Sequence, residues 1–355
     1  MNNLKNHIRT KRASLLGIVI ILVATMYFID GYVSGFWKTL LMLFGINVIF
    51  AVSLNITNSW INFFSIGHGG IILAGIYFAA FFTLPPGFKN GIVHLHLPEY
   101  VLNTQWTLLP ALLVGSLFGA LVAVLLAFPA LRLKSFYFCA GSLGFAIIVT
   151  NIAENIRSIT NGPAGLWQFP AYTSIWWVWG IAAAIVYLIL MLKKSAFGRA
   201  LIAIGRDQDL AEHMGINLLK YKIIAFALSG FIATCGGILW VHLIRTVSPS
   251  TFGLTFMFDI VAMMVIGGMG SISGAVIGAG VITFFLEVLA PIEEGFTLFG
   301  LQIPPFLGFT TILLGILFII VLIRKPEGIM GEKELSITAI SRFLKKLIED
   351  FGRSQ

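Results

Sequence analysis

The sequence predicts an all-α fold, a polytopic helical membrane protein with about ten transmembrane spans and cytoplasmic N- and C-termini. Of its 355 residues, 58% are hydrophobic and only 11% are charged, whereas soluble domains carry about 25% charged residues. The mean hydropathy is +0.95, and apolar runs long enough to cross a bilayer recur along the chain. Too few charges remain to cover a water-facing surface, so the chain is expected in a membrane.

The spans are placed where about 20 apolar residues can cross a hydrocarbon core of about 30 Å. Helices are expected because they satisfy every backbone polar group within the segment, and the short alternating strands of an outer-membrane barrel are absent from the sequence. The predicted spans are 14–30, 38–57, 65–83, 107–128, 136–156, 174–192, 221–243, 254–268, 272–290 and 306–323. The first resembles a signal peptide but lacks a small-residue cleavage site, so it is predicted to be retained.

The positions of the basic residues orient these spans. Lys and Arg gather between the apolar runs, at 5–12, 132–134, 193–222 and 324–325. This is the pattern of cytoplasmic loops under the positive-inside rule. The predicted outer loops contain few basic residues and cover 84–106, 157–173 and 291–305. The basic residues behind the net charge of +8 are therefore expected to orient the protein, and no nucleic-acid partner is expected.

The segment 193–222 differs from its surroundings because it is charged and patterned as helix. A first helix is expected at 197–204, and a second at 208–214 that ends at Gly215. Side chains that can cap the two helices are Ser195 and Asp207. A small apolar face on the second helix consists of Leu210, Ala211 and Met214. A helix this short is marginal alone, so a groove on a partner protein is expected to hold it. A plain surface helix is the alternative.

Two apolar regions are interrupted, by 58-NSWINFFSIGHGG-70 and by 267-GGMGS-271. Broken spans line substrate paths in transporters, but tight turns with close packing of small residues give the same pattern, and the sequence leaves both interpretations open. The chain is divided into a transmembrane domain, 1–331, and a tail, 332–355. The tail is expected to form an amphipathic helix on the cytoplasmic surface.

Polar side chains at membrane depth are costly and indicate function. The predicted substrate-pathway residues are Asn55, Asn58, Ser65, His68, Asn151 and Asp259. The first four flank the earlier break, where they could bind a zwitterionic or amide solute, or cap and join helices. Asn151 lies near the outer end of a span, where a solvated mouth is the alternative. Asp259 could meet a substrate amino group or neutralise a helix N-terminus.

The spacing Asp209-Leu210-Ala211-x-x-x-Gly215 resembles the Glu-Ala-Ala-x-x-x-Gly coupling loop of ATP-binding-cassette importer permeases, with Asp for Glu and Leu for Ala. Other stretches are similar to the LivM-type permeases of branched-chain amino-acid importers over most of 40–331. They are 64-FSIGHGG-70, 129-PALRLKSFYF-138, 161-NGPAGL-166, 198-GRALIAIGRDQDLAEHMGINLLKYKIIAFALSG-230, 259-DIVAMMVIGGMGSISGAVIGA-279 and 325-KPEGIMG-331. The chain departs from the family pattern at Asn62-Phe63, Ile147 and Asp259.

The resemblance implies a pore-forming permease subunit in the cytoplasmic (inner) membrane. Its solute would be branched-chain amino acids or, as an alternative, urea, short amides or another small solute. Its partners would be two cytoplasmic ATP-binding subunits, a second homologous permease, an extracytoplasmic solute-binding protein and membrane lipids. ATP and Mg would bind to the partner ATPase, and this chain would bind no cofactor. The residues expected to couple to the ATPase are Arg199, Asp209, Glu212 and Gly215.

Other functions find less support in the sequence. The chain has no phosphate-binding GxxxxGK[ST] loop, so it is not expected to be an enzyme and ATP must act through a partner. An ion-coupled secondary transporter normally needs carboxylates deep in its spans, and none is convincingly central. The six histidines are scattered without HExxH-like spacing, which disfavours an intramembrane enzyme or metal site. Cys139 and Cys235 lie in apolar runs and are expected to be free thiols.

Overall fold

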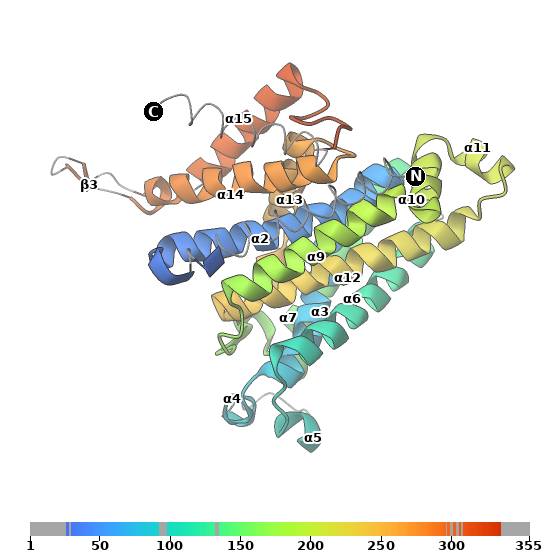
Figure 1. Ribbon diagram of the computed structural model, residues 1–355. Helices are drawn as coiled ribbons and strands as arrows, with labels where there is room; N and C mark the ends of the chain where they lie inside the picture. The colour runs from blue at the N-terminus through green and yellow to red at the C-terminus, as the bar shows by residue number, and fades with distance from the viewer. Residues whose placement is uncertain are drawn as a thin grey trace, which may run out of the picture.

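The computed structural model describes residues 26–27, 30–91, 98–131, 135–295, 297–298, 301–302, 305–306 and 308–334. These residues form a bundle of long helices (Figure 1). The long helices are α2 (Gly35–Asn55), α3 (His68–Thr83), α6 (Leu108–Ala130), α7 (Ser135–Asn155), α9 (Ile175–Lys194), α12 (Leu218–Ile244), α13 (Leu254–Gly267), α14 (Ile272–Glu294) and α15 (Phe309–Arg324).

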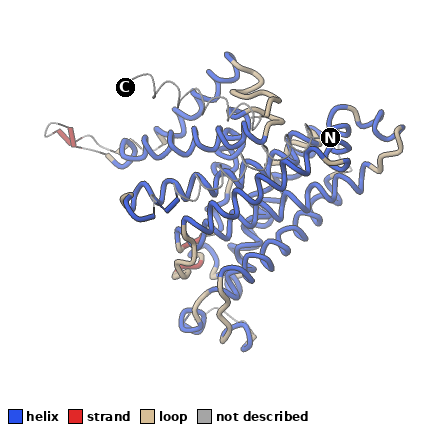
Figure 2. The backbone as a smooth tube through the Cα atoms, in the orientation of Figure 1, coloured by secondary structure: helices blue, strands red, loops and turns tan. Residues whose placement is uncertain are grey.

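Shorter elements connect these helices (Figure 2). The short helices are α4 (Pro86–Gly91), α5 (Glu99–Leu102), α8 (Arg157–Thr160), α10 (Ala196–Arg206) and α11 (Gln208–His213). A π-helical turn and two 3-10 turns are η1 (Ile56–Trp60), η2 (Gly162–Ala164) and η3 (Pro249–Phe252). Two antiparallel strand pairs join β1 (Leu166–Trp167) to β2 (Thr246–Val247) and β3 (Thr297–Leu298) to β4 (Leu301–Gln302).

The structure confirms a helical membrane fold. Seven described helical segments are long and apolar enough to span a membrane, and the shorter apolar helices α3 and α15 add two more candidates. These nine correspond in order to the predicted spans from 38–57 to 306–323. The predicted span 14–30 and the predicted tail helix at 332–355 lie almost entirely outside the described residues. Ten spans and cytoplasmic termini therefore stay predictions.

The centre of the bundle is built on α2 and α12, and small residues bring their neighbours close. In the spanning windows of α2 and α12, 72% and 67% of residues are buried, against 22% in α7 and α9. A Cβ added to Gly119 of α6 would lie 1.9 Å from the Thr234 hydroxyl oxygen of α12, and one on Gly230 would lie 2.5 Å from the Ala123 Cβ. This close approach gives van der Waals contact that lipid cannot replace.

The earlier break begins as a π-helical continuation of α2 and then becomes extended. Asn62 has a positive φ of 54°, a conformation that ends a helix, and α3 begins only at His68. The predicted start of the third span at 65 is therefore wrong by three residues, because the preceding backbone is used in side-chain hydrogen bonds. The amide N–H of Ser65, for example, donates to Asn58 Oδ1 at 2.9 Å.

The later break is a tight helical hairpin between α13 and α14. Gly268 and Gly270 have φ values of 122° and 94°, and residues other than glycine rarely adopt such values. A Cβ on Gly278 of α14 would lie 1.8 Å from the carbonyl oxygen of Met263 on α13. At this break the structure shows the turn with small-residue packing, one of the two interpretations that the sequence left open.

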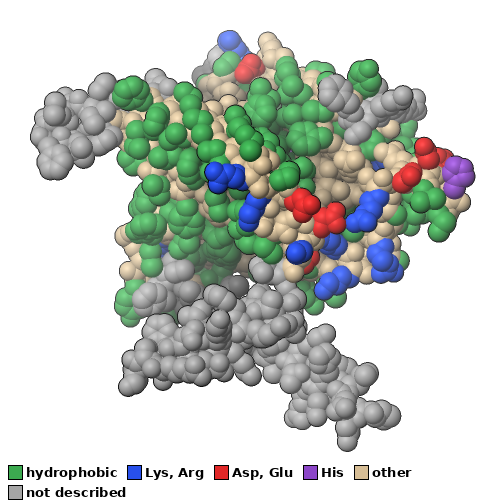
Figure 3. All heavy atoms as spheres, turned by 90° about the horizontal axis from the view of Figure 1, so that it is seen from above, with side chains coloured by type: hydrophobic (Ala, Val, Ile, Leu, Met, Phe, Trp, Pro, Cys, Tyr) green, Lys and Arg blue, Asp and Glu red, His purple; other side chains and the backbone are tan. Residues whose placement is uncertain are grey.

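Short helices lie at two ends of the bundle (Figure 1). We call the end that carries α10 and α11 the α10 end, and the end that carries α4 and α5 the α4 end (Figure 1). In the space-filling view, acidic and basic side chains gather toward α10 and α11, and hydrophobic side chains cover much of the remaining described surface (Figure 3). Both cysteines are free, with Cys235 buried and Cys139 half-buried.

Candidate functional site

The charged segment between α9 and α12 forms the two helices that its sequence predicts. Ser195 Oγ accepts the N–H of Gly198 at 3.2 Å and so caps α10. Asp207 Oδ1 accepts the N–H of Leu210 at 2.9 Å and caps α11. Gly215 then turns the chain with a φ of 83°. Both predicted caps are confirmed, and the helix ends differ from the predicted ones by at most two residues.

Helix α10 is fixed to the membrane bundle. Its buried face consists of Gly198, Leu201 and Ile204. A Cβ on Gly205 would lie 2.2 Å from the carbonyl oxygen of Trp60, so α10 touches the backbone of η1 directly. The ring of Phe197 stacks on Tyr221 of α12 with 5.2 Å between centroids. Any displacement of α10 therefore acts on η1 and α12 at once.

Helix α11 is held at its start and by buried Ala211, and it otherwise projects from the bundle. Lys222 of α12 donates a hydrogen bond to Gln208 Oε1 at 2.8 Å, and its ammonium lies 4.3 Å from the centre of the Phe63 ring. Beyond this anchor the apolar side chains of Leu210 and Met214 are 62% and 77% exposed. Leu210 and Met214 therefore present exposed apolar groups on an otherwise charged segment.

The predicted coupling residues separate into two places. Asp209, Glu212 and Gly215 are exposed on or just after α11, on the projecting surface. Arg199 lies on α10, where its guanidinium donates to the carbonyl of Lys194 at 2.6 Å. This contact satisfies one of the free carbonyls at the end of α9, so Arg199 has a structural partner within its own chain.

Two predicted pathway residues, Ser65 and His68, belong to a buried polar network near the earlier break. Ser65 Oγ lies 3.0 Å from His68 Nδ1, and His68 Nε2 lies 2.7 Å from Ser229 Oγ of α12. The Ser229 hydroxyl in turn donates to the carbonyl of Ser53 in α2 at 2.6 Å. The network therefore joins α2, α3 and α12. For Ser65 and His68 this is the second role that the sequence left open, that of joining helices rather than binding a solute.

The two asparagines at this break are less completely bonded. Asn55 Nδ2 donates to the carbonyl of Ser271 at 3.0 Å, which ties α2 to the α13–α14 turn. Asn55 Oδ1 and Asn58 Nδ2 are buried and have no hydrogen-bond partner within the described part of the chain. Buried polar atoms without partners are costly, so these two atoms are unsatisfied hydrogen-bonding groups within the bundle.

Asn151 lies in a different place, at a cleft between α7 and the start of α13. The cleft measures about 370 Å³, within the range of small-molecule sites. Its lining residues are Ile66, Leu143, Ala146, Ile147, Thr150, Asn151, Ser250, Phe252, Gly253, Leu254 and Met257. Apolar side chains therefore form most of the lining, and Thr150, Asn151 and Ser250 supply polar groups.

Asp259 does not line this cleft. It follows Met257 by two residues on α13, which turns it by about 200° around the helix axis. It also lies in the second turn of α13, and the first turn contains no acidic residue. Because the helix dipole acts within the first turn, the alternative in which Asp259 neutralises the N-terminus of α13 is wrong.

Comparison with known proteins gives a consistent result. The family model described as "Branched-chain amino acid transport system / permease component" matches residues 37–322. The permease LivM of the high-affinity branched-chain amino acid transport system of Escherichia coli K12 is 24% identical over 319 residues, 80% of this chain and 68% of LivM.

Relatives with other named solutes also match. The ribose import permease RbsC of Haemophilus influenzae is 26% identical over 234 residues, 62% of this chain and 70% of RbsC. The autoinducer 2 import permease LsrC of Escherichia coli O9:H4 is 30% identical over 194 residues, 52% of this chain and 54% of LsrC.

Proposed function

Because the chain belongs to the family of permease components of branched-chain amino acid transport systems, we propose that it forms the pore of an importer for these amino acids by ATP-driven alternating access. It is a permease component of an ABC import system and a multi-pass protein of the inner membrane. Such subunits act with ATP-binding and solute-binding partners. ATP and Mg act in the partner ATPase, and this chain carries out transport rather than a chemical reaction.

The observation that carries the coupling proposal is the exposed surface of α11. Leu210 and Met214 are four residues apart and therefore lie on one face of the helix. Exposed Asp209 and Glu212 accompany them, so a matching groove on the ATPase has an apolar floor and basic groups nearby. Gly215 provides the turn back toward α12. The contact of α10 with η1 then transmits a push on α11 to the membrane helices.

The solute route is proposed to pass the cleft beside Asn151. Its mostly apolar lining suits a branched aliphatic side chain better than urea or a short amide, and the Asn151 amide can bind a carboxylate or ammonium group. The exposed face of α7 carries Asn151 among Ile147, Ile148 and Ile152. A second homologous permease covering this face would complete the pore as a heterodimer. Asn55 and Asn58 would offer polar atoms further toward the α10 end, and Asp259 would meet the solute only from the other side of α13.

The coupling proposal is tested on the complex purified from its native membrane. Leu210→Ser and Met214→Ser should abolish co-purification of the ATPase and ATP-dependent leucine uptake by proteoliposomes, while leaving the thermal stability of the chain unchanged. Leu219→Ser is the matched control, because Leu219 is also an exposed apolar residue but lies at the start of α12. Retention of the ATPase by both α11 variants would refute α11 as the docking helix.

The solute is tested by competition in the same proteoliposomes. Unlabelled leucine, isoleucine and valine should displace labelled leucine, whereas urea and ribose should not. Asn151→Leu, which keeps the size of the side chain but removes its amide, should weaken uptake. Efficient displacement by urea or ribose would assign the pore to another solute without affecting the coupling proposal.

A further inference from the structure

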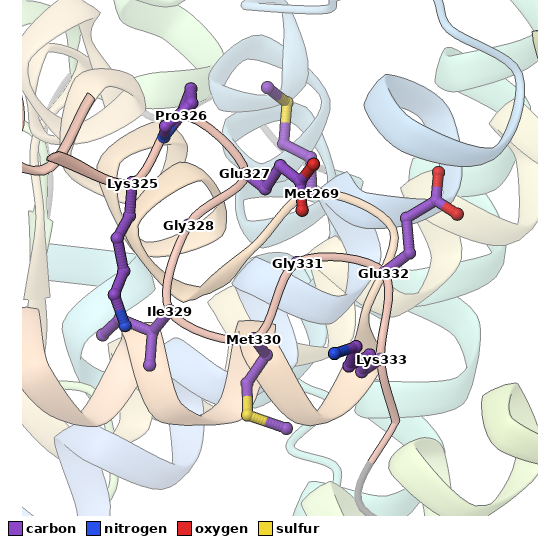
Figure 4. Close-up of a pocket in the computed structure, with 10 residues that line it drawn as sticks. All are labelled: Met269, Lys325, Pro326, Glu327, Gly328, Ile329, Met330, Gly331, Glu332 and Lys333. Carbon is purple, nitrogen blue, oxygen red and sulfur yellow. The ribbon is translucent and has the colours of Figure 1, made fainter. Parts of the chain in front are cut away.

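The residues that follow α15 pack against the turn between α13 and α14. We call residues 325–334 the strap. Together with Met269, residues 325–333 line an open cleft of about 890 Å³ (Figure 4). Gly328 and Gly331 have φ values of 76° and 59°, and a Cβ on Gly328 would lie 2.5 Å from the Cα of Gly268. The strap and the turn are therefore in backbone contact.

The strap caps the end of α13. The last carbonyl groups of a helix have no partner within it. Here the N–H of Ile329 donates to the carbonyl of Ile266 at 2.9 Å, and the N–H of Met330 donates to that of Gly267 at 3.0 Å. The position of the α13 C-terminus is thus tied to the strap by two backbone hydrogen bonds.

The same strap caps the start of α14 through Glu334. Its carboxylate accepts the N–H of Ile272 at 2.8 Å, and the N–H and hydroxyl of Ser273 at 2.9 Å and 2.8 Å. A carboxylate at this position also interacts favourably with the helix dipole. One short segment therefore holds both helix ends that meet at the hairpin turn.

Lys193 connects this arrangement to α10. Its ammonium lies 2.6 Å from Glu334 Oε1 and also donates to the carbonyl of Gly270. The side chains of Lys193 and Glu334 are only 18% and 24% exposed, whereas those of Arg206 and Glu332, which pair nearby, are 71% and 78% exposed. Solvent screens the Lys193–Glu334 pair much less, so it is the stronger link.

Lys193 and α10 move together because the chain between them is short and tightly packed. Lys193 lies in the last turn of α9, and α10 begins three residues later at Ala196. A Cβ on Gly198 of α10 would lie 2.8 Å from the Cα of Lys193. A displacement of α10 therefore carries the Lys193 side chain with it.

We propose that the Lys193–Glu334 pair and the strap make the α13–α14 hairpin follow α10 during transport. This inference rests on the proposed function, in which α10 and α11 receive the motion of an ATPase. The hairpin includes Met257, which lines the cleft beside Asn151, so movement of α13 reshapes that cleft. Lys193 and Glu334 are positioning residues that act on the solute route through the hairpin.

The test uses the complete reconstituted transporter and measures solute moved per ATP hydrolysed. Glu334→Gln and Lys193→Met should each lower this ratio by about fivefold or more, the size of a typical coupling free energy. Both variants should keep the ATPase bound and hydrolysing ATP. Lys193→Arg keeps the charge and should keep the ratio. Glu327→Gln is the matched control, since Glu327 is an exposed glutamate of the same strap.

The outcomes separate the inference from its premise. If the variants lower thermal stability or assembly but leave solute moved per ATP unchanged, the strap is only structural and the inference is wrong. The two substitutions share the Lys193–Glu334 ion pair, so in the double variant their effects on solute moved per ATP should be less than additive. Should Glu334→Gln fail to assemble, Lys193→Met leaves the cap of α14 in place and provides the same measurement. If the wild-type complex neither binds an ATPase nor uses ATP for uptake, the proposed function itself fails.

Discussion

The contact between α10 and η1 predicts a large effect for the smallest possible substitution, Gly205→Ala. The added Cβ would lie 2.2 Å from the carbonyl oxygen of Trp60 and 2.9 Å from its carbonyl carbon. Real Cβ contacts essentially never fall below 3.0 Å, so α10 must move away from η1 by roughly 1 Å to reach van der Waals distance. Overpacking of this kind typically costs about 1–3 kcal/mol.

The assay is thermal unfolding of the purified complex together with its uptake per ATP. For a chain of this size the expected cost corresponds to a fall in Tm of roughly 2–6 °C. Uptake per ATP should also fall, because α10 is displaced from its native position against η1. The matched control is Gly180→Ala in α9, where an added Cβ meets nothing within 4 Å. Equal Tm and uptake for Gly205→Ala, Gly180→Ala and the wild type would refute the reasoning.

Three other predictions concern buried polar groups. Burial would raise the pKa of Glu334, but the Lys193 ammonium and the N–H groups of Ser273 and Ile272 outweigh it and hold this pKa below its ordinary value of 4.5. The stabilising contribution of Glu334 is therefore present above its ordinary pKa of 4.5 and is lost as pH falls through the lower folded-state pKa. The melting temperatures of the wild type and Glu334→Gln should converge over that fall in pH. His68→Ala leaves Ser65 and Ser229 without their shared partner, and at about 1–3 kcal/mol for each unsatisfied group it should lower Tm measurably. The buried ammonium of Lys89 donates to the carbonyls of Phe81, Val101 and Thr104. Replacement of Lys89 by Met should therefore make α4 and α5 accessible to limited proteolysis. Lys38→Met, which removes a partly exposed ammonium, should not.

Local sequence signals predicted the parts of the fold that depend on neighbours along the chain. Ser195 and Asp207 were recognisable caps because a capping side chain bonds an N–H only three residues later. Gly215 was recognisable as the end of α11 for a similar reason. The start of α3 was misplaced because Ser65 lies in an apolar run but gives its N–H to Asn58. Hydropathy alone does not reveal that the backbone N–H of Ser65 is bonded to a side chain.

Contacts between distant segments explain what the sequence could not predict. Lys193 and Glu334 are 141 positions apart, and each looks like an ordinary charged residue of a solvated segment. Lys89 likewise gave no signal, since its three acceptors are backbone carbonyls that any residue type supplies. Asp259 stands where the sequence placed it, because α13 begins at Leu254 as the predicted span 254–268 does. Its sixth position in that helix already argued against a role at the N-terminus.

The distribution of polar contacts suggests which part of the bundle moves in the proposed transport cycle. Helices α3, α6 and α12 approach one another through small residues, and His68 and Ser229 join α3 to α12 within the interior. The turn of the α13–α14 hairpin is held differently, by Asn55 from α2, Lys193 from α9 and Glu334 from the strap. Packed interiors resist small displacements, whereas the hairpin turn depends on polar contacts from three separate segments. The hairpin is therefore the element that α10 can shift while the centre of the bundle stays intact.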